Sequence, residues 1–208
     1  MPPLKQLHAW YGDQVQFLDV LVRQAHPGRA RPAYVTYEQK LADARDYQRL
    51  EEIAWPVLVD DLAATVHRAY GGMSDPVYLI DARGYVAFYQ MWAHAPTLKE
   101  ALDELVAQGG KASAVKGGID RMPHMASAFV EGWRTLTRGG EPAVADVQRA
   151  FPGAPALIAL GYQARPVLGP LVVRATPVPR PVRLALWGGL AAVALGALWR
   201  RQAAARAD

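Results

Sequence analysis

Short apolar runs and helical repeats alternate over the first half of the chain. Four apolar runs predict β-strands, at residues 15–22, 56–59, 77–80 and 85–91. Elsewhere apolar residues recur every three or four positions, which predicts helices at residues 4–11, 37–53, 61–70 and 96–108. The run at 15–22 is expected to be buried, and Thr97 to cap the last helix. This order predicts an α/β fold, a mixed sheet with helices on both faces.

The pattern changes after Gly109. Residues 119–136 predict a helix with an apolar stripe, which is typical of a core or docking face: Met122, Met125, Phe129, Trp133 and Leu136. Residues 143–151 predict a shorter helix, and Leu168–Ala175 predicts a strand or an extended arm. This second region therefore reads as helical and extended.

Prolines and then apolar residues fill the C-terminal part. Eight of the 16 prolines lie between Pro142 and Pro181, and residues 177–183 predict an extended stalk that is not helical. The next 16 residues, Leu184–Trp199, carry no charge. As a helix they reach about 24 Å, somewhat short of a hydrocarbon core of about 30 Å. They predict a transmembrane helix, with a buried helix of a soluble domain as the alternative.

The residues in and around this segment fit an anchor that packs on other helices. Small residues recur at every fourth position, in a stripe formed by Gly188, Ala192 and Gly196. Residues suited to the membrane interface flank the segment: Arg183, Trp187, Trp199, Arg200 and Arg201. Because no signal peptide is visible, we expect a single-pass protein of the inner or cytoplasmic membrane with a cytoplasmic N-terminal domain.

These patterns divide the chain into five regions. They are a domain at 1–109, a helical and extended accessory region at 110–176, a stalk at 177–183, a transmembrane helix at 184–199 and a basic tail at 200–208.

Charge and cysteine content reduce the number of function classes that the chain can belong to. The 208 residues contain no cysteine, so this chain offers no disulfide, thiolate metal site or cysteine nucleophile. The formal net charge is +4, but nine arginines and three acidic residues lie from Arg138 onward. The surplus therefore surrounds the apolar segment and suits anionic lipid headgroups, and no nucleic-acid partner is expected.

Two segments carry a resemblance to a known family. Residues 14–28, QVQFLDVLVRQAHPG, follow Tyr-Gly-Asp and end in Ala25, His26 and Pro27. They resemble the strand and loop of the iodothyronine deiodinase-like branch of the thioredoxin-fold superfamily. The stretch 75–81, DPVYLID, looks like the cis-proline strand of that fold, which implies a cis bond at Pro76. The resemblance covers about residues 4–108 and implies a thioredoxin-like sheet.

The chain departs from the family where the chemistry lies. The family's first strand and its redox cysteine or selenocysteine have no counterpart here, and Gln24 replaces a glutamate. Without a thiolate, thiol exchange does not run in this chain. The place of the missing strand is expected to be filled by the arm at 168–175, by a strand of a partner or by residues upstream of Met1.

No other residue pattern predicts a catalytic, cofactor or metal site. His26 is interpreted as a polar loop residue, and His94 and His124 as loop and helix-start residues without metal-ligand spacing. Asp60 and Asp61 are interpreted as a strand end and helix cap.

Three functions remain open. The first is a non-catalytic, membrane-anchored accessory subunit of an integral-membrane complex of respiratory or photosynthetic type, with no small-molecule substrate. The second is a redox or deiodinase-like enzyme relative that depends on an upstream segment or a partner's cysteine. The third is a membrane-tethered assembly factor that binds extended peptides at the Pro76 surface by strand addition.

Overall fold

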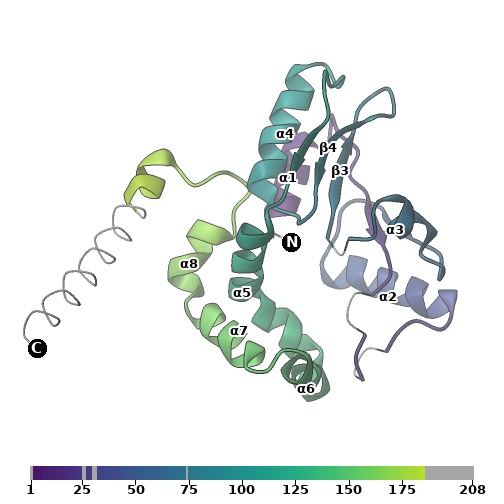
Figure 1. The fold of residues 1–208 in the computed structure, drawn as a ribbon, viewed down its shortest axis with the longest axis vertical. Helices are drawn as coiled ribbons and strands as arrows, with labels where there is room; N and C mark the ends of the chain where they lie inside the picture. Colours follow the sequence, from purple (N-terminus) through teal and green to yellow (C-terminus); the bar gives the residue numbers. More distant parts are fainter. Residues whose placement is uncertain (1, 25–26, 30–31, 74, 186–208) are drawn as a thin grey trace, which may run out of the picture. The chain divides into compact units, whose positions relative to one another are not determined.

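The first structural unit of the chain is an α/β assembly followed by a layer of helices (Figure 1). A computed structural model describes residues 2–24, 27–29, 32–73 and 75–185, and it separates residues 1–176 from residues 177–208. The elements run in the order α1 (Pro2–Tyr11), β1 (Asp19–Leu21), α2 (Tyr37–Leu50), β2 (Val57–Val59), α3 (Thr65–Ala69), β3 (Val77–Ile80), β4 (Val86–Gln90), α4 (Ala95–Ala107), β5 (Lys116–Gly118), α5 (Arg121–Arg138), α6 (Gly140–Ala150), α7 (Ala154–Gln163) and α8 (Arg165–Val172). Most of the predicted helices and strands are confirmed, with shifted bounds.

The described strands form two small sheets. In one, β1 pairs in parallel with β2; in the other, β4 lies between antiparallel β3 and parallel β5. The prediction of one thioredoxin-like mixed sheet is therefore wrong for the described residues. The apolar run at 15–22 contributes only three residues to β1, and Leu18 and Val20 are exposed. Partly buried and exposed side chains alternate from Val15 to Val20, so one face of this segment is covered and the other is exposed, and its expected full burial is wrong.

The turn between β3 and β4 is organised by Asp81. Its Oδ1 accepts hydrogen bonds from the backbone N–H groups of Arg83 (2.9 Å) and Tyr85 (3.1 Å), and its Oδ2 faces the Arg83 guanidinium at 2.7 Å. Burial alone would raise the pKa of Asp81, but Arg83 and these N–H groups lower it to about 2. Gly84 adopts a left-handed φ of 86° in the turn. The predicted hairpin is confirmed.

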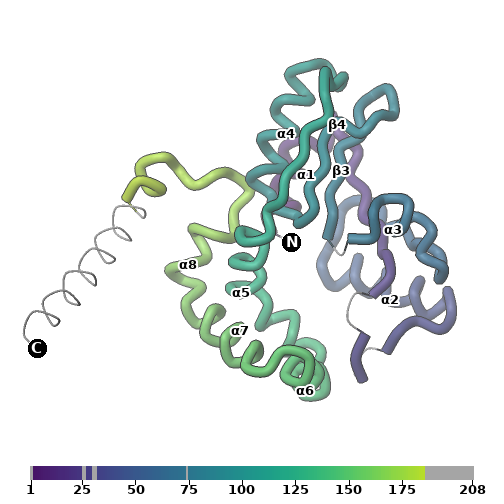
Figure 2. Tube along the Cα trace, viewed as in Figure 1, coloured from purple at the N-terminus to yellow at the C-terminus, as the bar shows by residue number. Residues whose placement is uncertain are grey.

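The main core lies between the β3–β4–β5 sheet and the helices α1 and α4, which pack against each other (Figure 2). Leu7 and Leu102 are fully buried there, in one cluster with Leu79 of the edge strand β3 and Phe88 of the central strand β4. Ala175 is also buried in this core, so the chain returns to it after α8. These apolar contacts join the ends of the first unit.

Two helix starts show how side chains set the boundaries. Thr36 forms a capping box with Gln39 at the start of α2, where its Oγ1 accepts a hydrogen bond from the Gln39 N–H at 3.3 Å. The expected cap at Thr97 is wrong, because α4 begins two residues earlier and His94 occupies the N-cap. Thr97 instead bonds the His94 ring.

Four helices, α5 to α8, form the C-terminal part of the first unit, and α5 contacts each of the others. The predicted helices at 119–136 and 143–151 are confirmed as α5 and α6. The predicted strand or arm at Leu168–Ala175 is wrong, because most of it belongs to α8. Pro166 suits the first turn of α8, because a backbone N–H at this position would have no acceptor within the helix.

The second unit contains a described helical segment at residues 180–185. The Arg183 N–H donates to the Pro179 carbonyl at 3.0 Å, a helical bond. The predicted non-helical stalk at 177–183 is thus wrong at its end, because Pro181 falls in the first turn, where proline is tolerated.

None of the helices described by the structure is long and apolar enough to cross a membrane. The predictions of a transmembrane helix, a single-pass protein and a location in the inner or cytoplasmic membrane are corrected accordingly. Arg183 is exposed, and most of the predicted span lies outside the described residues. The same holds for the predicted stripe and interface residues, which are Trp187, Gly188, Ala192, Gly196, Trp199, Arg200 and Arg201.

Candidate functional site

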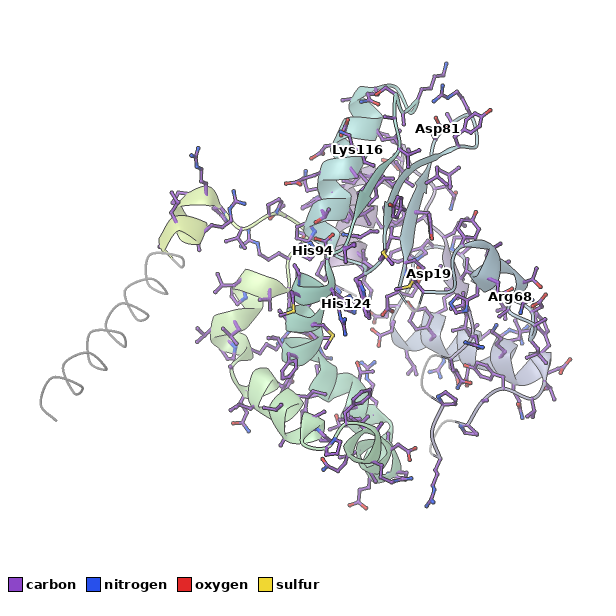
Figure 3. All side chains as sticks on the ribbon, viewed as in Figure 1. Asp19, Arg68, Asp81, His94, Lys116 and His124 are labelled. Carbon is purple, nitrogen blue, oxygen red and sulfur yellow. The ribbon has the colours of Figure 1, made fainter. Side chains whose placement is uncertain are left out.

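Two histidines and two carboxylates meet where α5 joins the sheet (Figure 3). We call this group the junction cluster: Asp75, Gln90, His94, Asp120 and His124. Asp75 precedes β3, Gln90 ends β4, His94 caps α4, and the other two residues start α5. The cluster therefore links the sheet, α4 and the helical layer.

Gln90 lies at the centre of the junction cluster and is fully buried. Its Nε2 donates to Asp120 Oδ2 at 2.5 Å, and its Oε1 accepts from the His94 N–H at 3.1 Å. The His94 ring contacts Thr97 Oγ1 at 2.9 Å and lies 3.9 Å from Asp120 Oδ1. One amide thus holds both a carboxylate and a helix N-cap in place.

His124 holds the first turn of α5 against the sheet. Its Nδ1 lies 2.9 Å from the Ala93 carbonyl, so this nitrogen carries the proton and donates. Its Nε2 faces Asp75 Oδ2 at 3.6 Å, and its ring packs against Trp92 with centroids 5.4 Å apart. The Arg121 guanidinium lies over Trp92 at 5.6 Å from the ring centroid. These side chains bond or pack against one another, so the arrangement is typical of a structural contact and not of a reactive group.

Acidification is expected to weaken the fold through His94. Burial lowers the pKa of His94, and His124 lowers it further, while Asp120 and Glu100 act in the opposite direction. The unfolded state binds the proton more readily, so the contribution of neutral His94 is complete above about pH 6.5. It is lost as the pH falls from there toward the lowered pKa, by at most about 1.4 kcal/mol per pH unit. Urea unfolding of the wild type and His94→Gln between pH 8 and pH 5 measures this.

Many groups titrate between pH 8 and pH 5, and comparing wild type with His94→Gln separates the contribution of His94 from the others. The stability difference between wild type and variant should shrink on acidification. A difference that stays constant over this range would contradict the assignment.

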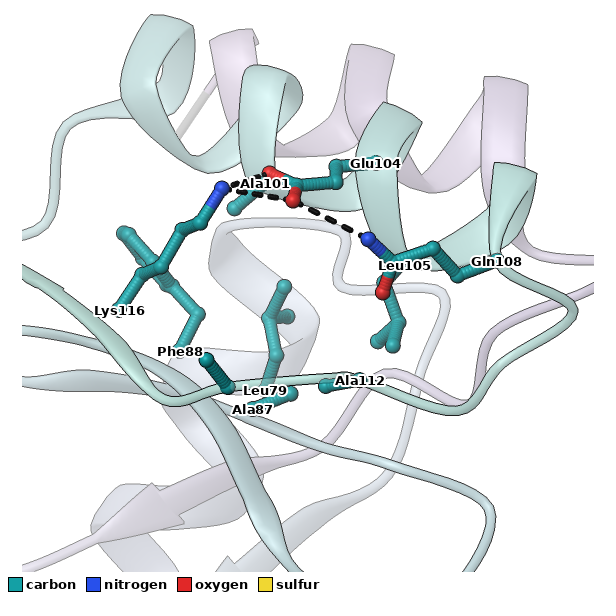
Figure 4. A pocket seen from close by; sticks show the side chains of 10 residues that line it. Leu79, Ala87, Phe88, Ala101, Glu104, Leu105, Gln108, Ala112 and Lys116 are labelled. Atoms are coloured by element: carbon teal, nitrogen blue, oxygen red, sulfur yellow. Dashed lines mark hydrogen bonds and ion pairs between the residues drawn. The ribbon is translucent and has the colours of Figure 1, made fainter.

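The pocket in Figure 4 lies between the sheet and α4, and residues of β3, β4, α4 and the segment leading into β5 line it. Leu79, Phe88 and Leu105 form its apolar wall, and Lys116 reaches Glu104 across its mouth at 2.6 Å. Its volume of about 20 Å³ has room for about one water molecule. A pocket of this size does not hold a substrate.

A second buried polar group supports the helix α3. The Asp60 carboxylate accepts from the N–H groups of Asp61, Val66 and His67 at 2.9–3.0 Å. Burial would raise the pKa of Asp60, but these donors hold it below its usual range. The Lys40 Nζ donates to the Asp60 carbonyl at 2.8 Å. Asp61 also accepts from the Thr65 N–H, at 2.9 Å. The pair therefore bonds the first N–H groups of α3, but the N-cap itself is Ala64, so the interpretation of Asp60 and Asp61 as a strand end and helix cap is confirmed only in part.

The residues taken from the family resemblance are spread apart or undescribed. Ala25 and His26 lie outside the described residues, and Pro27 is exposed. The described residues contain no cis peptide bond, so the prediction of a cis bond before Pro76 is wrong. Pro76 nevertheless follows Asp75 of the junction cluster.

Sequence reasoning missed the junction cluster. Its only local signal is the spacing of Asp120 and His124, which lie four residues apart and so share one face at the start of a predicted helix. The structure adds Asp75 and His94 from distant segments. Within the described ranges, no group of three or more acidic and histidine side chains is arranged to hold a metal ion.

Comparison with known proteins gives no match to a family model, to a curated protein or to a solved structure. The resemblance to the deiodinase-like branch of the thioredoxin fold therefore stays a prediction.

Proposed function

We propose that this chain is a non-catalytic docking subunit that binds a partner protein through the outer face of α7. The observation that carries the proposal is the apolar surface that α7 and its neighbours expose. The 208 residues contain no cysteine, so none of them supplies a thiol.

The helix α7 is apolar on nearly all of its surface, and its polar residues, Tyr162 and Gln163, both lie in its last turn. Its sequence APALIALGYQ carries no charged residue. One side packs closely on α5, where a side chain at Gly161 would collide with the Phe129 backbone and Ile158 lies against Gly132. A helix that is apolar on all sides is normally covered on all sides. We therefore expect a partner protein to cover the outer side of α7.

That outer side exposes large apolar side chains. Leu160 is 62% exposed, and Leu157 lies one turn before it with a similar exposure. Phe151 before α7 and Val167 in α8 extend the exposed apolar residues on either side along the chain. Leu157 and Leu160 share one face of α7 by their spacing, and an exposed apolar face marks a protein interface more often than a solvated surface. The lack of charged side chains on α7 favours an apolar partner surface.

Charge substitution on α7 tests the proposal. The double variant Leu157→Glu/Leu160→Glu is expected to fold normally, because both side chains are exposed. Partner binding should fall by about 100-fold, since each leucine buried on docking contributes about 1.5 kcal/mol or more. The measurement is quantitative mass spectrometry of proteins co-purified with the tagged full chain from native cells.

Leu50→Glu provides the matched control, because Leu50 is an equally exposed leucine of α2. A partner retained by wild type and Leu50→Glu, but lost from the α7 variant, supports the proposal. Equal retention by all three proteins, or equal loss from both variants, would contradict it.

A further inference from the structure

The smaller sheet, formed by β1 and β2, has a helix on one of its faces. The two strands pair in parallel, and α2 packs against β2. The Tyr47 hydroxyl of α2 donates to Asp19 Oδ2 at 2.9 Å, so the Asp19 side chain points to this helix. Parallel strands in proteins are normally covered by helices on both faces. The face opposite α2 is therefore the part of this sheet to explain.

The face opposite α2 is apolar and exposed. Side chains alternate along a strand, so Leu18 and Val20, on either side of Asp19, point away from α2. Leu58 lies beside Val20 in the register of the two strands. Leu18 is 53% exposed and Leu58 is 47% exposed, and Val20 and Pro56 are exposed as well. We call these four residues the open sheet face, and none of them carries a charge.

The helix α7 has the properties that a cover for the open sheet face needs. A charged side chain placed on this apolar face would lose hydration without gaining a partner. None of the residues of α7 is charged, and Leu157 and Leu160 project from its outer side. Both surfaces are exposed in one copy of the chain, so they do not cover each other there. A contact between them therefore requires two copies.

We propose that the outer side of α7 in one copy packs on the open sheet face of a second copy. This inference rests on the proposed docking function and names the partner of the α7 surface. The contact joins two different surfaces, so a pair of copies retains one free α7 and one free open sheet face. The contact therefore repeats head to tail and builds a ring or a filament.

A head-to-tail contact removes more apolar area from water than pairing of α7 with α7. Each head-to-tail contact covers an α7 surface and an open sheet face together. Pairing of two α7 helices would leave Leu18, Val20 and Leu58 of both copies in water. Because the driving force grows with the apolar area that is buried, the contact of helix with sheet is favoured.

Self-association of the purified full chain tests the proposal, measured by sedimentation over a range of protein concentrations. The wild type should form oligomers larger than a dimer as its concentration rises. Leu157→Glu/Leu160→Glu and Leu18→Glu/Leu58→Glu should each weaken association by about 100-fold, since each places two charges in the contact. Leu50→Glu, on an exposed position of α2, should associate like the wild type. Thermal unfolding of the variants checks their folding.

Mixing the two double variants distinguishes the head-to-tail contact from a symmetric one. The α7 variant keeps its open sheet face, and the sheet variant keeps its α7, so one intact contact forms between them. The mixture should give a dimer and no larger oligomer, because the remaining α7 and open sheet face both carry charges. Association of the wild type through α7 that mixing does not restore would overturn the proposal in favour of pairing between α7 helices.

Hydroxyl-radical labelling of the wild type provides a measurement that needs no variant. Raising the protein concentration should lower the labelling of Leu18, Leu58, Leu157 and Leu160, and leave Leu50 unchanged. Protection of the two α7 leucines without the two sheet leucines would overturn the proposal. Association that neither double variant weakens would also overturn it, because another segment would then hold the copies together.

The same measurements separate this inference from the proposed docking function. A chain that stays monomeric at all concentrations, yet retains a different protein through α7 in the co-purification, overturns the head-to-tail contact and leaves the docking function standing. A monomeric chain whose α7 variant retains the same proteins as the wild type overturns both.

Discussion

Truncation of Leu102 to alanine is expected to lower the free energy of unfolding by about 3 kcal/mol. Leu102 is 0% exposed at the centre of α4 and contacts the core formed with α1 and the sheet. The variant loses the transfer free energy of the removed carbons and leaves a cavity that packed neighbours fill only in part. Urea unfolding followed by circular dichroism measures the change.

Leu50→Ala is the control for Leu102→Ala, because it makes the same truncation at a helical leucine that is 55% exposed. It should cost less than about 1 kcal/mol. If the two variants lost similar stability, the core would not be centred between α1, α4 and the sheet.

Replacement of Gln90 by leucine is expected to cost about 3 kcal/mol in unfolding free energy. The substitution keeps the side chain's bulk but removes the donor to Asp120 and the acceptor for the His94 N–H. The Asp120 carboxylate then stays partly buried without its closest hydrogen bond. Loss of one partner of such a group costs its full desolvation penalty. The measurement is again urea unfolding at pH 7.

Two further variants identify the cause of the Gln90→Leu effect. Gln108→Leu alters an exposed amide that bonds Glu104, and should change stability by less than about 0.5 kcal/mol. In the double variant Gln90→Leu/Asp120→Ala the carboxylate is gone, so its loss of stability should be clearly smaller than the sum of the single losses. Additive losses would show that Gln90 does not act through Asp120.

The chain order of the fold could be predicted from the sequence, because it rests on local patterns. The hairpin around Asp81 and the helix α5 depend on residues within one element or turn, and the structure confirms both. The predicted stripe of α5 is only partly covered, since Met122 and Met125 are exposed. The division into two sheets was missed, because strand pairing depends on segments far apart in the chain. Leu168–Ala175 was misassigned, because a short apolar run suits a strand as well as a helix, and here packing against α5 accompanies the helix α8.

The junction cluster could not be predicted, because its members come from four segments. The sequence shows His94 and His124 as isolated residues 30 positions apart. Only the pairing of β4 with β5 carries the chain from Gln90 to the start of α5 and brings Asp120 beside it. A contact of this kind depends on tertiary structure that hydrophobic periodicity does not encode.

The hairpin closed by Asp81 has a consequence for the order of folding. Its turn joins residues only two to four positions apart, so it closes a short loop at small entropic cost. The hairpin is therefore expected to form early, whereas β1 must find β2 across almost forty residues. The newly made chain would then carry a finished β3 edge before its other sheet exists. In the cell, we expect the exposed β3 edge to pair with other strands most readily during this interval, and chaperones to bind the chain at this stage.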